Sequence, residues 1–181
     1  MKKVTILFTL VLFSIVSRSQ EEVGYRTTDI GAQFQYHYYG TVTSLHAAFN
    51  SRIHHSFLVQ LGYNKANRKD KGEKDLESGS GWGGALGYRY YLRPFPHKLF
   101  VGLKADIYKM KIDWVDGILA GQSRTWMLQP SLEVGYTIII NDQGFITPYI
   151  ANGVQVNLKT EGDKVGQGFV PIVGISAGFR L

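Results

Sequence analysis

One carboxylate, Glu133, lies in the middle of an apolar segment, residues 125–140 (TWMLQPSLEVGYTIII). Counted by twos, the segment separates into an apolar row that begins at Trp126 and a second row that contains Gln129 and Glu133. A period of two is that of a β-strand. Because an unpaired charge is costly away from water, the Glu133 side chain needs a partner on the less apolar face of this strand.

Three other charged residues are candidates for that partner. If the hairpin formed by residues 99–108 and 125–140 is centred on residues 118–119, cross-strand positions sum to about 237, which places Lys104 opposite Glu133 and Asp106 opposite Ser131. Arg89 lies on the inward row of the preceding strand. We therefore expect an ion-pair network of Arg89, Lys104, Asp106 and Glu133.

The sequence also contains a second possible ion pair and a possible hydrolase site. Asp29 and Arg180 lie near the two ends of the patterned region, so we expect them to pair where the first and last strands meet. A hydrolase needs a nucleophile and a base within hydrogen-bond reach, and His37, Ser44 and His46 come nearest to that arrangement. No acidic residue follows at a suitable spacing, and two histidines without a third ligand do not define a metal site. We predict no catalytic residue, no metal and no cofactor.

The elements that position these side chains are strands. Alternating patterns recur from about residue 28 to residue 181, and we count eight strands. Short turns are expected near residues 50–55, 93–97 and 141–144, whereas residues 64–81 and 113–124 are expected to be longer polar loops. The sequence therefore predicts an all-β protein, an eight-stranded antiparallel up-and-down transmembrane β-barrel.

The two ends of the chain suggest export. Residues 1–19 combine Lys2 and Lys3, an apolar run of about 13 residues and small residues at 17 and 19, the features of a signal peptide. Residues 20–181 would then form one barrel domain. Without residues 1–19 the chain keeps 17 basic and 14 acidic residues, a net charge of +3 that does not indicate a nucleic-acid partner.

The less apolar faces are rich in glycine, serine, threonine, glutamine and alanine, which suit the inside of a narrow tube better than a water-exposed exterior. This distinguishes a membrane barrel from a soluble lipocalin-like carrier. Aromatic residues gather at the strand ends, as in the two belts at membrane interfaces. The expected belts contain Trp82, Trp114, Trp126, Tyr38 and Tyr63 at one end and Phe49, Phe57, Phe145 and Phe179 at the other.

Residues 28–181 resemble the small eight-stranded outer-membrane barrels of the OmpX and OmpA transmembrane type. The terminal Gly178-Phe179-Arg180-Leu181 is similar to the C-terminal signal of that class, although the last residue there is often aromatic. The ends of the chain also resemble those of Bacteroidota outer-membrane barrel proteins. The resemblance implies a location in the cell outer membrane and contact with the barrel-assembly machinery during biogenesis.

The sequence leaves three functions open. The first is a structural, adhesive or accessory-subunit role with a side-chain-filled lumen. The second is a lipid-modifying enzyme resembling a lipid A deacylase or acyltransferase, and the third is a narrow porin-like channel. Expected partners are outer-membrane lipid and lipopolysaccharide, and an envelope protein that contacts loop 64–81.

Overall fold

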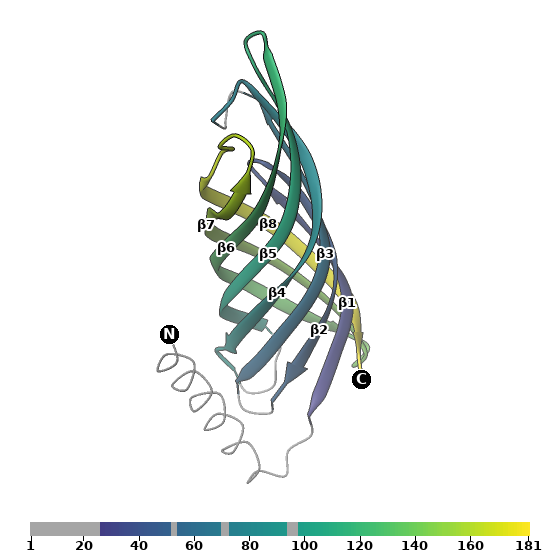
Figure 1. The fold of residues 1–181 in the computed structure, drawn as a ribbon. Coiled ribbons are helices and arrows are strands. Elements are labelled where there is room, and N and C mark those ends of the chain that lie inside the picture. The colour runs from purple at the N-terminus through teal and green to yellow at the C-terminus, as the bar shows by residue number, and fades with distance from the viewer. Residues whose placement is uncertain (1–25, 52–53, 70–72, 94–97) are drawn as a thin grey trace, which may run out of the picture.

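The computed structural model describes residues 26–51, 54–69, 73–93 and 98–181. Within these ranges lie eight strands, each paired antiparallel with its neighbours in chain order. They are β1 (Thr27–His37), β2 (Gly40–Asn50), β3 (His55–Lys69), β4 (Leu76–Tyr91), β5 (Lys98–Asp116), β6 (Leu119–Ile140), β7 (Gly144–Glu161) and β8 (Gly168–Arg180). Because β1 also pairs with β8, the sheet closes on itself (Figure 1), and the predicted barrel is confirmed.

The expected signal peptide, residues 1–19, lies outside the described residues. Among the residues that the structure describes, there is no helix long and apolar enough to cross a membrane.

Side chains alternate between the two surfaces of the sheet, except at a β-bulge in β7. The exterior is apolar around the ring, with Leu45, Leu61, Leu103 and Ile150 each at least 61% exposed. The interior holds most of the buried polar residues, among them Gln60 and Glu133. This distribution is the reverse of that in a soluble barrel, because the exterior faces lipid rather than water.

The strands differ greatly in length. β1 and β2 have 11 residues each, enough to cross a bilayer, whereas β5 has 19 and β6 has 22. The surplus lies at the end of the barrel opposite the start of β1 and the end of β8, where the β5–β6 hairpin projects beyond its neighbours (Figure 1). We call this the hairpin end, and the opposite one the terminal end.

Two of the expected loops are largely strand. Residues 113–124 continue β5 and β6 up to a two-residue turn at Gly117 and Ile118, and residues 64–81 contain the ends of β3 and β4. A positive φ of 59° at Gly117 followed by an ordinary residue fits the type II′ turn that joins tight hairpins. The sequence prediction was wrong because strands that leave the membrane lose their apolar exterior row while keeping their ladder of backbone hydrogen bonds.

The aromatic belts are also smaller than expected. Trp82, Trp126, Phe49 and Phe179 are exposed on the exterior, but Trp114 and Phe145 are buried inside the barrel. Trp114 is an even number of residues from Lys104 on β5, and Phe145 is an even number of residues from Tyr149 on β7. Both rings therefore face inward with those residues, although they lie near strand ends.

Candidate functional site

The lumen is the place where charged side chains converge. The Arg89 guanidinium donates to the Glu133 carboxylate across 2.6 Å, and both side chains are almost fully buried. The Arg89 guanidinium also lies 4.6 Å from the centroid of the Phe100 ring. Gly102 occupies the position between them, since it pairs with Arg89 on β4 and with Glu133 on β6. A methyl group at Gly102 would lie 2.9 Å from Glu133, so the absent side chain there makes room for the ion pair.

The other two residues of the expected network form a separate pair. The Lys104 ammonium lies 3.3 Å from the Asp106 carboxylate and donates to the Gln35 amide oxygen at 3.0 Å. Lys104 is opposite Ser131 rather than Glu133, and Asp106 is opposite Gln129 rather than Ser131. The expected register was wrong because the turn lies at residues 117–118, one residue before the assumed centre. The structure thus brings all four residues into the lumen as two ion pairs.

Asp29 and Arg180 face each other where β1 meets β8. The Arg180 guanidinium donates to both Asp29 oxygens at 2.7 Å, a bidentate geometry that is among the strongest available to a carboxylate. Backbone bonds between Thr28 and Leu181, at 2.8 and 3.0 Å, extend the same seam.

His37, Ser44 and His46 all face the lumen, but the Ser44 hydroxyl accepts from the Gln60 amide. The His46 ring packs edge-on against the Phe145 ring, 5.9 Å away. Within the described part of the chain, no hydrogen bond joins either histidine to Ser44, and no three His, Asp or Glu residues are placed to hold a metal ion. His37, Ser44 and His46 therefore do not make the nucleophile–base contact that a hydrolase requires.

The mouth at the hairpin end is closed by the β7–β8 connection. Arg68 on β3 and Glu77 on β4 form a fully buried ion pair at 2.8 Å. Arg68 also donates to the Gly166 carbonyl at 2.5 Å and to the Gln155 amide oxygen at 3.0 Å, while the Gly166 N–H donates to the Glu77 carboxylate at 2.9 Å. The connection is thus held by both members of one ion pair, an arrangement that we call the mouth latch.

Apolar contacts fill the space below the latch. Val165, next to Gly166, is 2% exposed and belongs to a cluster inside the hairpin end. The other members of that cluster are Val42, Ala66, Tyr108, Met110, Ile112, Trp114 and Met127. A second cluster extends from the terminal end and comprises Tyr91, Phe100, Tyr149, Ala151, Val170 and Ile172. Both clusters and the ion pairs lie in the lumen.

Lys74 joins three connections above the mouth. Its ammonium lies 3.1 Å from Asp116, 3.6 Å from Asp163 and 4.6 Å from the centroid of the Trp114 ring. The hydrogen bond to the Asp116 carboxylate raises the pKa of Lys74 above its usual value. The ammonium therefore stays charged at any physiological pH and keeps the β3–β4 connection beside the β5–β6 hairpin.

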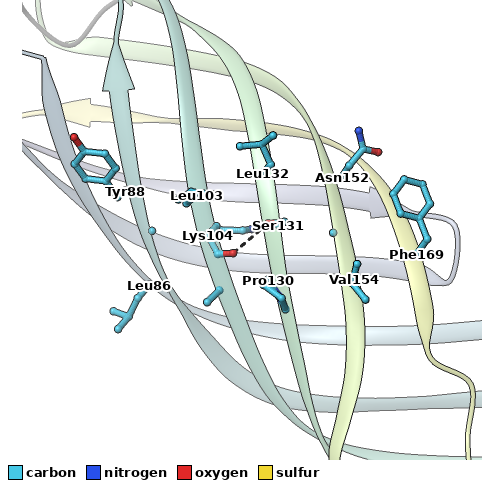
Figure 2. A pocket seen from close by; sticks show the side chains of 13 residues that line it. Leu86, Tyr88, Leu103, Lys104, Pro130, Ser131, Leu132, Asn152, Val154 and Phe169 are labelled. Carbon is cyan, nitrogen blue, oxygen red and sulfur yellow. Dashed lines mark hydrogen bonds between the residues drawn. The ribbon is translucent and has the colours of Figure 1, made fainter. Parts of the chain in front are cut away.

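The exterior carries one broad groove over β4 to β8, with a volume of about 690 Å³. Figure 2 shows Leu86, Leu103, Leu132, Val154 and Phe169 around it, and a hydrogen bond from the Ser131 hydroxyl to the Lys104 carbonyl within the wall. Asn152 is the polar exception on this lipid-facing surface. The groove is apolar and open, as expected for a surface that lipid acyl chains cover.

No family model and no curated protein matches the sequence. Solved structures do match the fold. The N-terminal β-barrel domain of Pseudomonas aeruginosa OprF is 12% identical, with a TM-score of 0.54, 87% of this chain covered and 99% of that one. The attachment invasion locus protein Ail of Yersinia pestis is 7% identical, with a TM-score of 0.53 and the same coverage. A major outer-membrane protein of Thermus thermophilus is 12% identical, with a TM-score of 0.50, 87% of this chain covered and 100% of that one.

The fold is therefore that of the small eight-stranded outer-membrane barrels, the OmpX and OmpA type. With an exterior that is apolar around the ring, the protein is an integral protein of the outer membrane. At sequence identities of 7–12%, the similarity to these structures shows the fold alone. Function depends on the side chains that this barrel carries.

Sequence reasoning missed Arg68, Glu77 and Gln155, the side chains of the mouth latch. Arg68 and Glu77 were assigned to a solvated loop because residues 64–81 are rich in charge. Continuing the inward count from Gln60 along β3, and from Ala85 back along β4, would have placed both inside. The inward position of these two side chains is indicated by the alternation of inward and outward residues along each strand, and not by the composition of the segment.

Proposed function

We propose that the protein is a closed, non-enzymatic barrel that anchors the β3–β4 and β5–β6 hairpins at the cell surface, where they bind a protein partner. The observation that carries the proposal is the mouth latch, in which Arg68 and Glu77 hold Gly166 over a filled lumen. Eight strands enclose little more than their own side chains, so a closed mouth argues against a channel.

The hairpin tips supply the surface for a partner. Ile118 is fully exposed and Leu119 is 63% exposed at the β5–β6 turn, beyond the bilayer-spanning part of the strands. Exposed apolar residues held on a stiff hairpin are typical of a protein contact. Lys74, Asp116 and Gly117 stiffen the base of this tip, since Gly117 N–H also donates to Asp75 at 2.9 Å.

Two measurements test the proposal. In planar bilayers the purified protein should give no conductance steps at either polarity, and regular steps would contradict a closed lumen. In living cells, a photo-crosslinking residue in place of Ile118 should join the barrel to a protein of defined mass. The same residue in place of Gln143, in a turn of the terminal end, is the control. Equal crosslinking at both positions would contradict recognition by the hairpin tip.

A further inference from the structure

A small pocket on the exterior is lined by cations. Lys109 on β5, Arg124 and Trp126 on β6, and Lys159 and Glu161 on β7 surround a volume of about 230 Å³. We call it the cation pocket. Three cations against one carboxylate leave it with a net positive charge, and Lys111, the cross-strand neighbour of Arg124, adds a further cation beside it.

The pocket lies where the apolar exterior stops. On β5 the outward row runs from Leu99 to Ile107 and then changes to Lys109 and Lys111. On β6 the same change occurs between Leu128 and Arg124, with Trp126 between them. Tryptophan and the long cationic side chains prefer this boundary between acyl chains and headgroups. The pocket is therefore at headgroup depth in the leaflet on the hairpin side.

The strand register builds a row of alternating rings and ammonium groups. Trp82 pairs with Lys109, Lys109 with Trp126, and Trp126 with Lys159. The Lys109 ammonium lies 5.9 Å from the centroid of the Trp126 ring. Lys109 and Lys159 each lie beside a tryptophan on a neighbouring strand. The indole rings restrict the conformations that these lysine side chains can adopt.

A β-bulge turns Lys159 towards this row. Between Trp126 and Met127 the β6–β7 register shifts by one residue, so that Leu158 and Lys159 both face outward. In an unbroken alternation Lys159 would face the lumen. Bulges of this kind re-aim side chains at functional positions.

The cations of the pocket are poorly neutralised by the protein. Lys159 lies 3.3 Å from Glu161, with both side chains more than 60% exposed. Arg124 faces Glu161 across the ladder, yet no ion pair or hydrogen bond from its guanidinium to another described residue is formed. An arginine held at headgroup depth beside two lysines matches the geometry and charge of a phosphate group.

The outward cations at the hairpin end lie on β3, β5, β6 and β7, and the last three of these strands meet at the cation pocket. At the hairpin end of β1, β2 and β8, the outward residues are Tyr36, Tyr38, Thr41, Thr43 and Phe169, and none carries a charge. A general attraction to anionic lipid would distribute cations around the ring. The pocket, where three neighbouring strands each contribute a cation, is therefore favoured as the binding position.

We infer that the cation pocket binds a phosphate group on the headgroup of an outer-leaflet glycolipid. The lipid is favoured over free phosphate because the apolar wall directly below, from Ile107 and Leu128, continues as a surface for acyl chains. The inference rests on the proposed exposure of the hairpin end at the cell surface. Its failure would leave the closed-lumen and crosslinking results unchanged.

The test titrates the purified full-length barrel in mild detergent with bisphosphorylated lipid A and with the same lipid after removal of its phosphates. Because a basic side chain near a charged headgroup contributes about 1 kcal/mol, Arg124→Gln and Lys159→Gln should each weaken binding of the phosphorylated lipid about fivefold. Glu161→Gln should tighten it. Lys65→Gln, which removes an outward cation on β3 away from the pocket, is the matched control and should have little effect.

Equal affinity for the two lipids would overturn the inference, as would equal losses in Lys65→Gln and Arg124→Gln. Inorganic phosphate at millimolar concentration should not displace the lipid, and displacement would show that free phosphate is the ligand instead. All four variants should keep the heat-dependent gel shift of the folded barrel, because the substituted side chains are exposed.

Discussion

Arg68 and Glu77 are nine residues apart in the chain, lie on adjacent strands, and form an ion pair that is fully buried at 2.8 Å. The same two side chains bind the N–H and the carbonyl of Gly166, so the closed mouth depends on a pair of charges. A buried charge that loses its partner is strongly destabilising, which makes this contact the most sensitive point of the hairpin end.

Glu77→Gln should therefore loosen the β7–β8 connection. The substitution leaves Arg68 without its counter-charge and should lower the free energy of unfolding by about 3 kcal/mol. Urea titration in detergent, followed by the heat-dependent gel shift, measures this loss. Glu73→Gln in the β3–β4 connection is the control, because the Glu73 side chain is exposed. Equal stability of the two variants would contradict the role of the latch.

Glu133→Leu should destabilise the middle of the lumen by leaving Arg89 unpaired, at a cost of about 3 kcal/mol. The double variant Arg89→Leu with Glu133→Leu should recover part of that loss, since it removes both charges. Thermal unfolding of the two single variants and the double variant gives the coupling energy. If the loss of stability in the double variant equalled the sum of the losses in the two single variants, the 2.6 Å ion pair between Arg89 and Glu133 would contribute nothing to stability.

Gly102→Ala should disturb the same ion pair without removing a charge. The added methyl group would lie 2.9 Å from Glu133 and from the Tyr88 carbonyl, so we expect a loss of about 1–2 kcal/mol from overpacking. Gly144→Ala, where the nearest atom is at 3.3 Å, should cost less. The comparison uses the same thermal gel-shift assay, and a harmless Gly102→Ala would show that the lumen adjusts freely.

Asn152→Leu should stabilise the barrel. Asn152 is exposed on the lipid-facing groove between Ile150 and Val154 of its own strand, and the amide makes no side-chain hydrogen bond within the described residues. Replacing the amide by an apolar group in lipid should raise the free energy of unfolding by about 1 kcal/mol. Urea titration in lipid vesicles measures the change. A decrease would mean that the amide has a polar partner in the membrane.

Much of the fold could be predicted from the sequence because alternation is a local property. The parity of each strand decides whether Arg89, Lys104, Asp106 and Glu133 face the lumen, and all four do. Which of them touch depends on register, and register follows from the position of a two-residue turn that composition does not reveal. A shift of one residue in the turn moved Lys104 from Glu133 to Ser131.

The mouth could not be predicted in the same way. Arg68 and Gly166 are 98 residues apart in sequence, and their contact depends on how the β7–β8 connection folds inward. Counting by twos along β3 and β4 places Arg68 and Glu77 inside, but it does not show that Gly166 lies against them. Only the closed ring shows that Arg68, Glu77 and Gln155 point to one centre.

The seam between β1 and β8 has a consequence for biogenesis. The two strands that seal the ring are the first and the last of the barrel to be synthesised, so neither edge meets its permanent neighbour until Arg180 has been added. During that interval both edges expose unpaired backbone groups, which readily join strands of other chains. A shortened chain that lacks β8 would therefore be an open sheet prone to aggregation rather than a smaller barrel, and the newly made protein needs protection until its ends can meet.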